Sequence, residues 1–204
     1  MTPPARDSLA PPSPLRVLAL LGLLAAWAGP AGAQAVPALP FTGGAAAFRV
    51  RATVVKDFTG TVAAARAQYT GTALAGVQGF VEFQVAEMHT GVGLRDRHTR
   101  AAMAADSFPL IRFDLTGVEP ALQGGDTVSV VFRGRLTIRG VTREVRAPGA
   151  VVLGHGGLEV TATFSIDMRD YGITPPVRML GALRVAPDIE VRVHLVFGDV
   201  AAPD

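Results

Sequence analysis

Apolar and polar residues alternate along most of this chain, and that alternation limits the possible folds more than any other feature of the sequence. In TVSVVFRGRLTI, residues 127–138, apolar residues recur at every second position from Val128 to Phe132 and again from Leu136 to Ile138. Successive side chains of a strand point to opposite faces, so a period of two predicts strands with one apolar and one wet face. The pattern predicts eight strands, at residues 48–55, 60–71, 77–85, 110–115, 127–138, 141–153, 158–168 and 189–197.

Eight antiparallel strands with almost no helix to cover them favour a closed barrel, because closure removes the exposed strand edges. The predicted fold class is therefore all-β, an antiparallel eight-stranded barrel, with a β-sandwich as the competing architecture. A barrel of this size holds either a packed interior or one small ligand. One hairpin is predicted in detail, with a two-residue turn at Arg139 and Gly140, where Gly140 supplies the positive φ that such a turn requires.

The stretch RDRHTRAAMAADSFPLIRF, residues 95–113, interrupts the alternation and brings Asp, His and Arg residues close together. Its Ala-rich part, residues 97–107, favours a helix that Asp96 can cap and Pro109 ends. We expect this one short helix to lie near a barrel end. A cap and solvated charges are the simpler interpretation of the stretch, and acid–base chemistry or an anion site is the alternative.

Residues 1–33 have the pattern of a secretory signal peptide. Arg6 and Arg16 precede an apolar run at 17–29, and small residues lead to a cleavage site after Ala33. The run is shorter than the ~20 apolar residues of a spanning helix. We therefore expect export to the periplasm or the extracellular space without stable membrane insertion. The chain has no cysteine, so neither a disulfide nor a lipobox anchor is available.

The rest of the chain is predicted to divide into three parts. A flexible N-terminal arm at 34–46 lacks periodicity, one barrel domain spans 47–199, and a short tail covers 200–204. Without the charged residues of the leader, acidic and basic residues almost balance. That balance excludes the basic surface typical of nucleic-acid-binding proteins.

Motifs for catalysis and for metal binding are weak in this sequence. His89, Asp96 and His98 match no standard zinc spacing. The HGG at 155–157 is not accompanied by the G-x-S-x-G motif of a serine nucleophile. We therefore expect no metal, no cofactor and no enzymatic activity.

Four segments resemble the YceI-like family of exported polyisoprenoid-binding proteins. They are TGVGLRDRHTR at 90–100, SFPLIRF at 107–113, GRLTIRGVTREV at 134–145 and YGITPP at 171–176. The similarity runs from about Val77 to Phe197. Two departures are that Thr99 stands where the family commonly has Leu or Met, and that Phe108 replaces a tyrosine. The resemblance implies a lipocalin-like barrel whose apolar lumen takes an isoprenoid chain, such as a polyprenyl phosphate or a quinone, without catalysis.

The candidate binding residues follow from the inward faces of the predicted strands. They are Val81, Phe83, Ile111, Phe113, Val130, Phe132, Phe164, Val193 and Phe197. Two arginines are candidates for binding an anionic head group: Arg143, which the hairpin places opposite Leu136, and Arg100 in the predicted helix.

The predicted function is that of an exported protein that carries or sequesters an isoprenoid-type lipid. Two alternatives stay open. One is an enzyme that acts on a small molecule at the barrel mouth through Asp96, His98 and Arg100. The other is an envelope interaction protein with a filled barrel and an outward binding face. The oligomeric state, monomer or dimer, is also left open.

Overall fold

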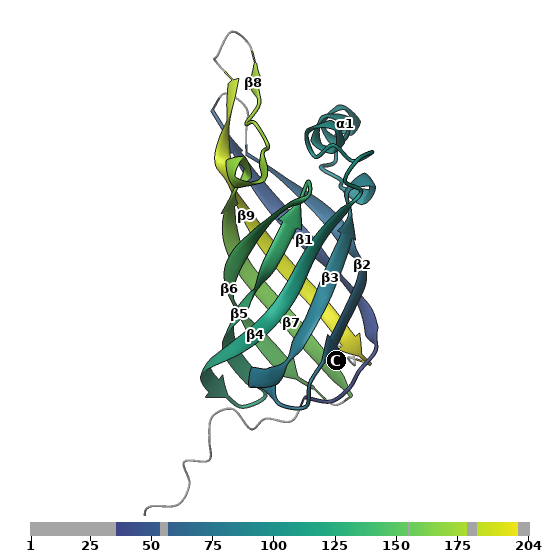
Figure 1. Ribbon diagram of the computed structural model, residues 1–204, viewed down its shortest axis with the longest axis vertical. Helices are drawn as coiled ribbons and strands as arrows, with labels where there is room; N and C mark the ends of the chain where they lie inside the picture. Colours follow the sequence, from purple (N-terminus) through teal and green to yellow (C-terminus); the bar gives the residue numbers. More distant parts are fainter. Residues whose placement is uncertain (1–35, 54–56, 155, 179–182, 200–204) are drawn as a thin grey trace, which may run out of the picture. The chain divides into compact units, whose positions relative to one another are not determined.

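The computed structural model describes residues 36–53, 57–154, 156–178 and 183–199. The predicted signal peptide at 1–33 and the predicted tail at 200–204 lie outside these ranges. Within them most residues are in strands, and Figure 1 shows these strands wound around a common axis.

Eight strands form the wall of a closed barrel. They are β1 (Phe41–Ala52), β2 (Phe58–Thr70), β3 (Gln78–Gln84), β4 (Leu110–Gly124), β5 (Thr127–Ile138), β6 (Val141–Leu153), β7 (Gly157–Asp167) and β9 (Leu183–Gly198). Neighbouring strands pair antiparallel in this order, and pairing of β1 with β9 closes the ring. The predicted antiparallel eight-stranded barrel is therefore confirmed, and the sandwich alternative is wrong. A ninth strand, β8 (Val177–Arg178), was not predicted and pairs with the start of β9.

The predicted hairpin between β5 and β6 is confirmed in its register and its turn. Ile138 pairs with Val141, and the two residues between them have positive φ values, 50° for Arg139 and 74° for Gly140. Both values suit a type I′ turn, whose twist matches that of the flanking strands.

The first strand begins earlier than the sequence predicts. Residues 41–46, assigned to the flexible arm, form the first half of β1, where Gly44 pairs with Leu195 and Ala46 with Val193. This half of the strand consists mostly of glycine and alanine, which give no alternation of apolar and polar side chains. The boundary at residue 46 was wrong because it was placed where the alternation begins, whereas pairing with β9 orders the chain from Phe41.

Glycines on the inner side of the barrel make room for aromatic rings of the neighbouring strands. A Cβ atom on Gly60 would lie 2.1 Å from the Phe48 ring, and one on Gly134 would lie 2.4 Å from the Phe113 ring. Each ring therefore lies directly over a glycine, which is a known way of filling the space that a strand glycine leaves. This packing fixes where Phe48 and Phe113 can lie inside the barrel.

The helix, α1 (Gly93–Ala102), is present but shifted toward the N-terminus. It begins at Gly93, so Asp96 lies within its first turns and is not the N-cap that the sequence predicts. The carboxylate of Asp96 instead accepts hydrogen bonds from the backbone N–H and the hydroxyl of Thr90, at 2.7 Å and 2.5 Å. The helix ends at Ala102, before the Ala-rich run does, and Ala104 then adopts a positive φ of 51°.

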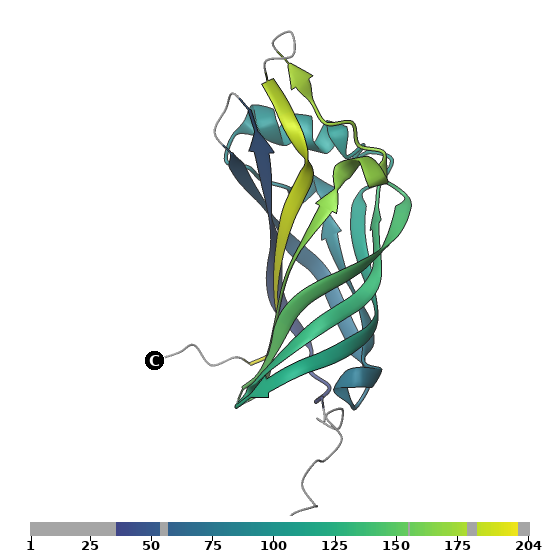
Figure 2. The same cartoon turned by 90° about the vertical axis from the view of Figure 1, so that its left-hand side faces the viewer.

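The longest connections lie at one end of the barrel. At one end lie the 3₁₀ helix η3 (Val85–Glu87), α1, the 3₁₀ helix η4 (Met168–Tyr171) and β8. At the other end, β4–β5 and β6–β7 are joined by tight turns, and β2–β3 by the 3₁₀ helix η2 (Leu74–Gly76). Figures 1 and 2 show α1 and β8 together at the same end, opposite the end where β9 finishes. The expected position of the helix near a barrel end is confirmed.

Candidate functional site

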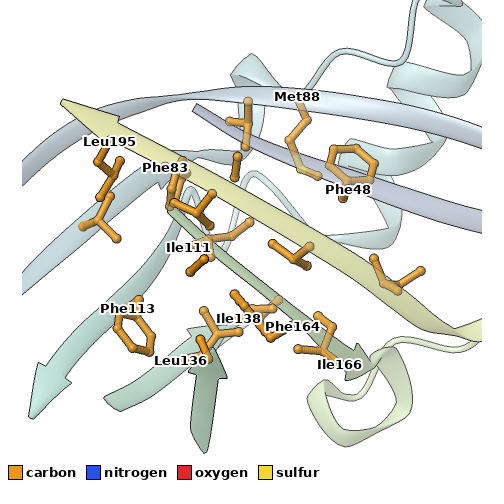
Figure 3. Close-up of a pocket in the computed structure, with 18 of the residues that line it drawn as sticks. Phe48, Phe83, Met88, Ile111, Phe113, Leu136, Ile138, Phe164, Ile166 and Leu195 are labelled. Carbon is orange, nitrogen blue, oxygen red and sulfur yellow. The ribbon is translucent and has the colours of Figure 1, made fainter. Parts of the chain in front are cut away.

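The barrel encloses a cavity of about 820 Å³. All eight wall strands contribute side chains to it, and almost all of these side chains are apolar. Figure 3 shows Phe48, Phe83, Phe113 and Phe164 projecting from different strands into the shared space. The cavity lies within the 300–1,000 Å³ range typical of ligand pockets. The interior is not filled, so the alternative of a packed barrel is wrong.

Small inward residues keep this space open. Ala46 on β1, Ala147 on β6 and Ala162 on β7 line the cavity, each at a position where a larger side chain would reach toward the axis. Eight strands form a barrel just wide enough for side chains to fill it. Alanines at these inward positions therefore leave an open lumen, whereas larger aliphatic residues would fill it and form a packed core.

Eight of the nine predicted binding residues line the cavity. They are Val81, Phe83, Ile111, Phe113, Phe132, Phe164, Val193 and Phe197. Val130 is the exception. It points inward and is only 2% exposed, but the cavity-lining side chains do not include it. Contact of these residues with a ligand stays a prediction, while their arrangement around one space is a feature of the fold.

One end of the cavity is closed by the segment that precedes β1. Val36 lines the cavity there, and its backbone N–H donates to the carbonyl of Thr72 at 2.9 Å. The hydroxyl of Tyr69 donates to the carbonyl of Pro37 and accepts from the backbone N–H of Leu39. We call residues 36–40, held in this way, the closing segment.

Aromatic packing seals the same end of the barrel. The Phe197 ring lies 4.9 Å from the Tyr69 ring and 5.5 Å from the Phe41 ring, both edge to face. Leu74 and Leu158, which also line the cavity here, are 5% and 4% exposed. The sequence assigned the closing segment to a flexible arm, and the one signal against that assignment was its apolar composition, VPALP at 36–40.

The other end of the cavity opens beside α1. Val92 and Leu94 line the cavity, yet they are 46% and 54% exposed. Large apolar side chains that are in contact with both the lumen and the solvent mark the opening. Since the corresponding residues at the closed end are buried, the cavity is accessible from the α1 end.

Polar side chains that line the cavity are few, and three of them lie on α1. Arg95, His98 and Thr99 face the lumen together with Leu94 and Ala102. These positions are three or four residues apart, so they share one face of a helix with 3.6 residues per turn. Arg95 was not among the binding residues that the sequence predicted.

Neither of the two predicted head-group arginines lines the cavity. Arg143 keeps its predicted partner, Leu136, but its side chain is exposed at the barrel end and its guanidinium donates to the Thr142 carbonyl at 3.3 Å. Arg100 lies on the other side of α1 and donates to the backbone carbonyls of Ala86 at 3.2 Å and Met88 at 3.5 Å. Arg100 thus links the helix to η3.

The set Asp96, His98 and Arg100 does not converge on one point. Successive residues of a helix are turned by about 100° around its axis, so residues two apart lie on nearly opposite sides. Asp96 is therefore directed away from His98. Asp96 is directed toward Thr90 and toward His89, whose Nδ1 lies 3.8 Å from the carboxylate. These contacts, the Thr90 hydroxyl first, hold the pKa of Asp96 below its ordinary value of 3.8. The carboxylate is therefore a structural acceptor, and the geometry expected of an acid–base pair is not formed.

Within residues 36–53, 57–154, 156–178 and 183–199, no three His, Asp or Glu side chains come together as ligands for a metal ion. Among the same residues, no helix has the length and the apolar character needed to cross a membrane.

The chain also matches a known protein family. The family model of the YceI-like domain matches residues 40–197. The comparison with curated protein sequences gives no match.

Several solved structures share the fold. BcnA of Burkholderia cenocepacia superposes with a TM-score of 0.62 at 19% identity, over 75% of this chain and 95% of that one. A polyisoprenoid-binding domain from Saccharophagus degradans, implicated in plant cell wall breakdown, gives 0.59 at 13% identity, over 79% and 99%. The YceI protein of Campylobacter jejuni gives 0.51 at 15% identity, over 67% and 81%. Each of these similarities establishes the barrel fold, which is lipocalin-like as the resemblance implied.

Proposed function

Since this chain belongs to the YceI-like domain family, we propose that it is a non-enzymatic binding protein that holds an isoprenoid-type lipid in its lumen. The cavity is the observation that carries the proposal: it is almost wholly apolar, and exposed apolar side chains line it at the α1 end. The Saccharophagus degradans domain with the same fold is described as polyisoprenoid-binding. A polyprenyl phosphate or a quinone are the ligands we favour.

The size of the cavity sets how much of such a ligand can be buried. If each non-hydrogen atom occupies ~30 Å³, as a water molecule does in the liquid, about 820 Å³ accommodates on the order of 25 to 30 atoms. That is close to five isoprene units. Each buried methylene contributes about 0.8 kcal/mol, so the tail alone can give tight binding. A longer chain would fill the lumen and extend from the open end.

The ligand is carried or sequestered outside the cytoplasm in this proposal. Export rests on the signal-peptide pattern of residues 1–33. Sequencing the N-terminus of protein recovered from the periplasm or the medium tests it, with cleavage after Ala33 as the expected result. A protein that stays in the cytoplasm with residues 1–33 attached would contradict export, but not lipid binding.

Native mass spectrometry tests the proposed binding directly. Protein produced with its leader should carry a lipid that solvent extraction releases and that mass spectrometry identifies as prenyl-derived. Ala162→Phe should reduce the bound fraction severalfold, because the ring would occupy the lumen, whereas Thr163→Phe on the outer face should not. Native protein that is always empty and takes up no offered lipid would contradict the proposal.

A further inference from the structure

Arg95 is the one Arg, Lys, Asp or Glu among the described residues that line the cavity. Its side chain is half-buried on the inner face of α1, and its guanidinium carbon lies 4.2 Å from the centre of the Phe58 ring. Phe58 also lines the cavity, at the start of β2. Among the described lining residues, the one fixed charge is therefore located at the open end.

This arginine differs from most others in its partners. Arg49 pairs with Asp57 at 3.0 Å, and Arg66 pairs with Glu82 at 2.9 Å. Arg95 forms no ion pair with any carboxylate in the part of the chain that the structure describes, and its hydrogen bond to the Thr90 carbonyl is long, at 3.5 Å. Arg95 is half-buried, so water solvates only part of its guanidinium, and an anion at the mouth would add a charge-assisted partner, a negative charge. No such charge is supplied by the described side chains.

Two more hydrogen-bonding side chains lie beside Arg95. Thr99 follows it by one helical turn on the same face, and His98 lies next to Thr99 and also lines the cavity. The three side chains contribute a guanidinium, an imidazole and a hydroxyl at the opening. Stacking on Phe58 restrains the guanidinium plane through a cation–π contact, which leaves its N–H groups available at the mouth.

We propose that Arg95, assisted by His98 and Thr99, binds the anionic head group of an amphiphile whose tail lies in the lumen. The proposal rests on the proposed lipid-binding function and specifies the ligand class: a prenyl phosphate or a long-chain carboxylate, since the planar guanidinium donates two parallel hydrogen bonds to either group. The head group lies at the α1 end, and the tail runs toward the closing segment. Arg143 and Arg100 are not part of this site.

Matched ligands test the head-group contact separately from the tail. Geranylgeranyl monophosphate and geranylgeraniol share one tail, and palmitate and hexadecanol share another. Arg95→Gln should weaken binding of the two anions by about tenfold, the lower end of the range for a charge-assisted hydrogen bond because the site is half-exposed. It should leave binding of the two alcohols within about twofold. A loss confined to one anion identifies the natural head group as phosphate or as carboxylate.

Three variants serve as controls. Arg97→Gln removes a charge from the neighbouring position of α1 that is exposed and does not line the cavity, and Arg143→Gln removes one from the β5–β6 hairpin. Neither should change the affinity ratio of anion to alcohol. Arg95→Lys should retain part of the preference for anions, because the charge stays while the paired donors are lost.

The outcomes separate the two proposals. Equal losses for anions and alcohols on Arg95→Gln, or no loss for either, would overturn the head-group assignment and leave lipid binding intact. The same holds if Arg143→Gln produces the selective loss. Failure of native protein to bind any of the four ligands would overturn the head-group site, and if native protein also carries no extractable lipid it would overturn the proposed function. Circular dichroism of each variant establishes that the barrel is folded.

Discussion

The two ends of the barrel are built in different ways. At the closed end, the closing segment, Tyr69, Phe197 and Leu74 bury apolar side chains and satisfy backbone groups with hydrogen bonds. At the open end, α1 leaves Val92 and Leu94 exposed and directs Arg95 toward the lumen. Both ends connect the same strands. The closed end is stabilised by buried apolar side chains, whereas the open end leaves apolar side chains exposed around the entrance.

This difference indicates where stability and function are located. Segments with few buried contacts open at low free energy, and ligand-binding elements are drawn from such segments. The closed end should therefore behave as part of the folded core. The open end should tolerate substitution while determining which ligand enters. The following predictions test that division, beginning with the largest effect.

Phe197→Ala should be among the most destabilising substitutions at the closed end. The ring is 4% exposed and contacts two other aromatic rings, and truncation of a buried Phe costs about 3–5 kcal/mol. Phe58→Ala at the open end should lower the free energy of unfolding by less than about 2 kcal/mol, because Phe58 is only half-buried. Urea unfolding followed by circular dichroism gives both values. Equal losses would contradict the division between the two ends.

Thiol labelling should show which end admits small molecules. The chain has no cysteine, so Leu94→Cys and Leu74→Cys each introduce a single reactive group. Leu74 is 5% exposed and Leu94 is 54% exposed. We expect the thiol at position 74 to react about a hundredfold more slowly, because labelling there requires local opening. Bound lipid should protect position 94. A faster reaction at position 74 would show that ligands enter from the other end.

Asp96→Asn should have the smallest effect, and the effect should depend on pH. The folded pKa of Asp96 is lowered, chiefly by the Thr90 hydroxyl, and the unfolded value is about 3.9. The carboxylate therefore stabilises the fold fully above that value, and this contribution disappears as pH falls through the folded pKa. Native protein should exceed Asp96→Asn in stability at pH 7, and the difference should shrink below about pH 4.

Unfolding midpoints at pH 7 and pH 3 measure this difference. The backbone N–H of Thr90 donates to Asp96, so its hydrogen exchange is an independent measure of the Thr90–Asp96 contact. Exchange of that amide should be faster in Asp96→Asn at pH 7. A stability difference between the two proteins that stays constant down to pH 3 would show that the Thr90–Asp96 contact does not stabilise the charged carboxylate.

The sequence predicted the wall of the barrel well and its ends poorly. Alternation identified the inner faces of the strongly alternating strands, so eight of the nine chosen side chains line the cavity. The β5–β6 hairpin was predicted because Gly140 and its neighbours encode the turn locally. The closing segment was missed because residues 36–40 carry no periodic pattern. Their order comes from hydrogen bonds with Tyr69, Thr72 and Gly198, far away in the sequence.

The choice of head-group arginine shows the same limit. Arg143 was chosen because its cross-strand partner Leu136 points inward, and the pairing is confirmed. Its side chain nevertheless lies in solvent, since the strand pair reaches the barrel end at that position. Arg95 was overlooked as a lining residue because its direction depends on where α1 begins, and the helix begins at Gly93 rather than after Asp96.

By itself, the sequence determined that the chain is all-β, which side chains face inward, and where a tight turn must occur. These features follow from the two-residue repeat of a strand and the backbone freedom of glycine, which are local properties. Tertiary structure alone decided that the inward faces enclose a cavity, that one end is sealed, and that Arg95 faces the lumen. Those outcomes depend on how far side chains from opposite walls reach toward one another, and no single segment contains that information.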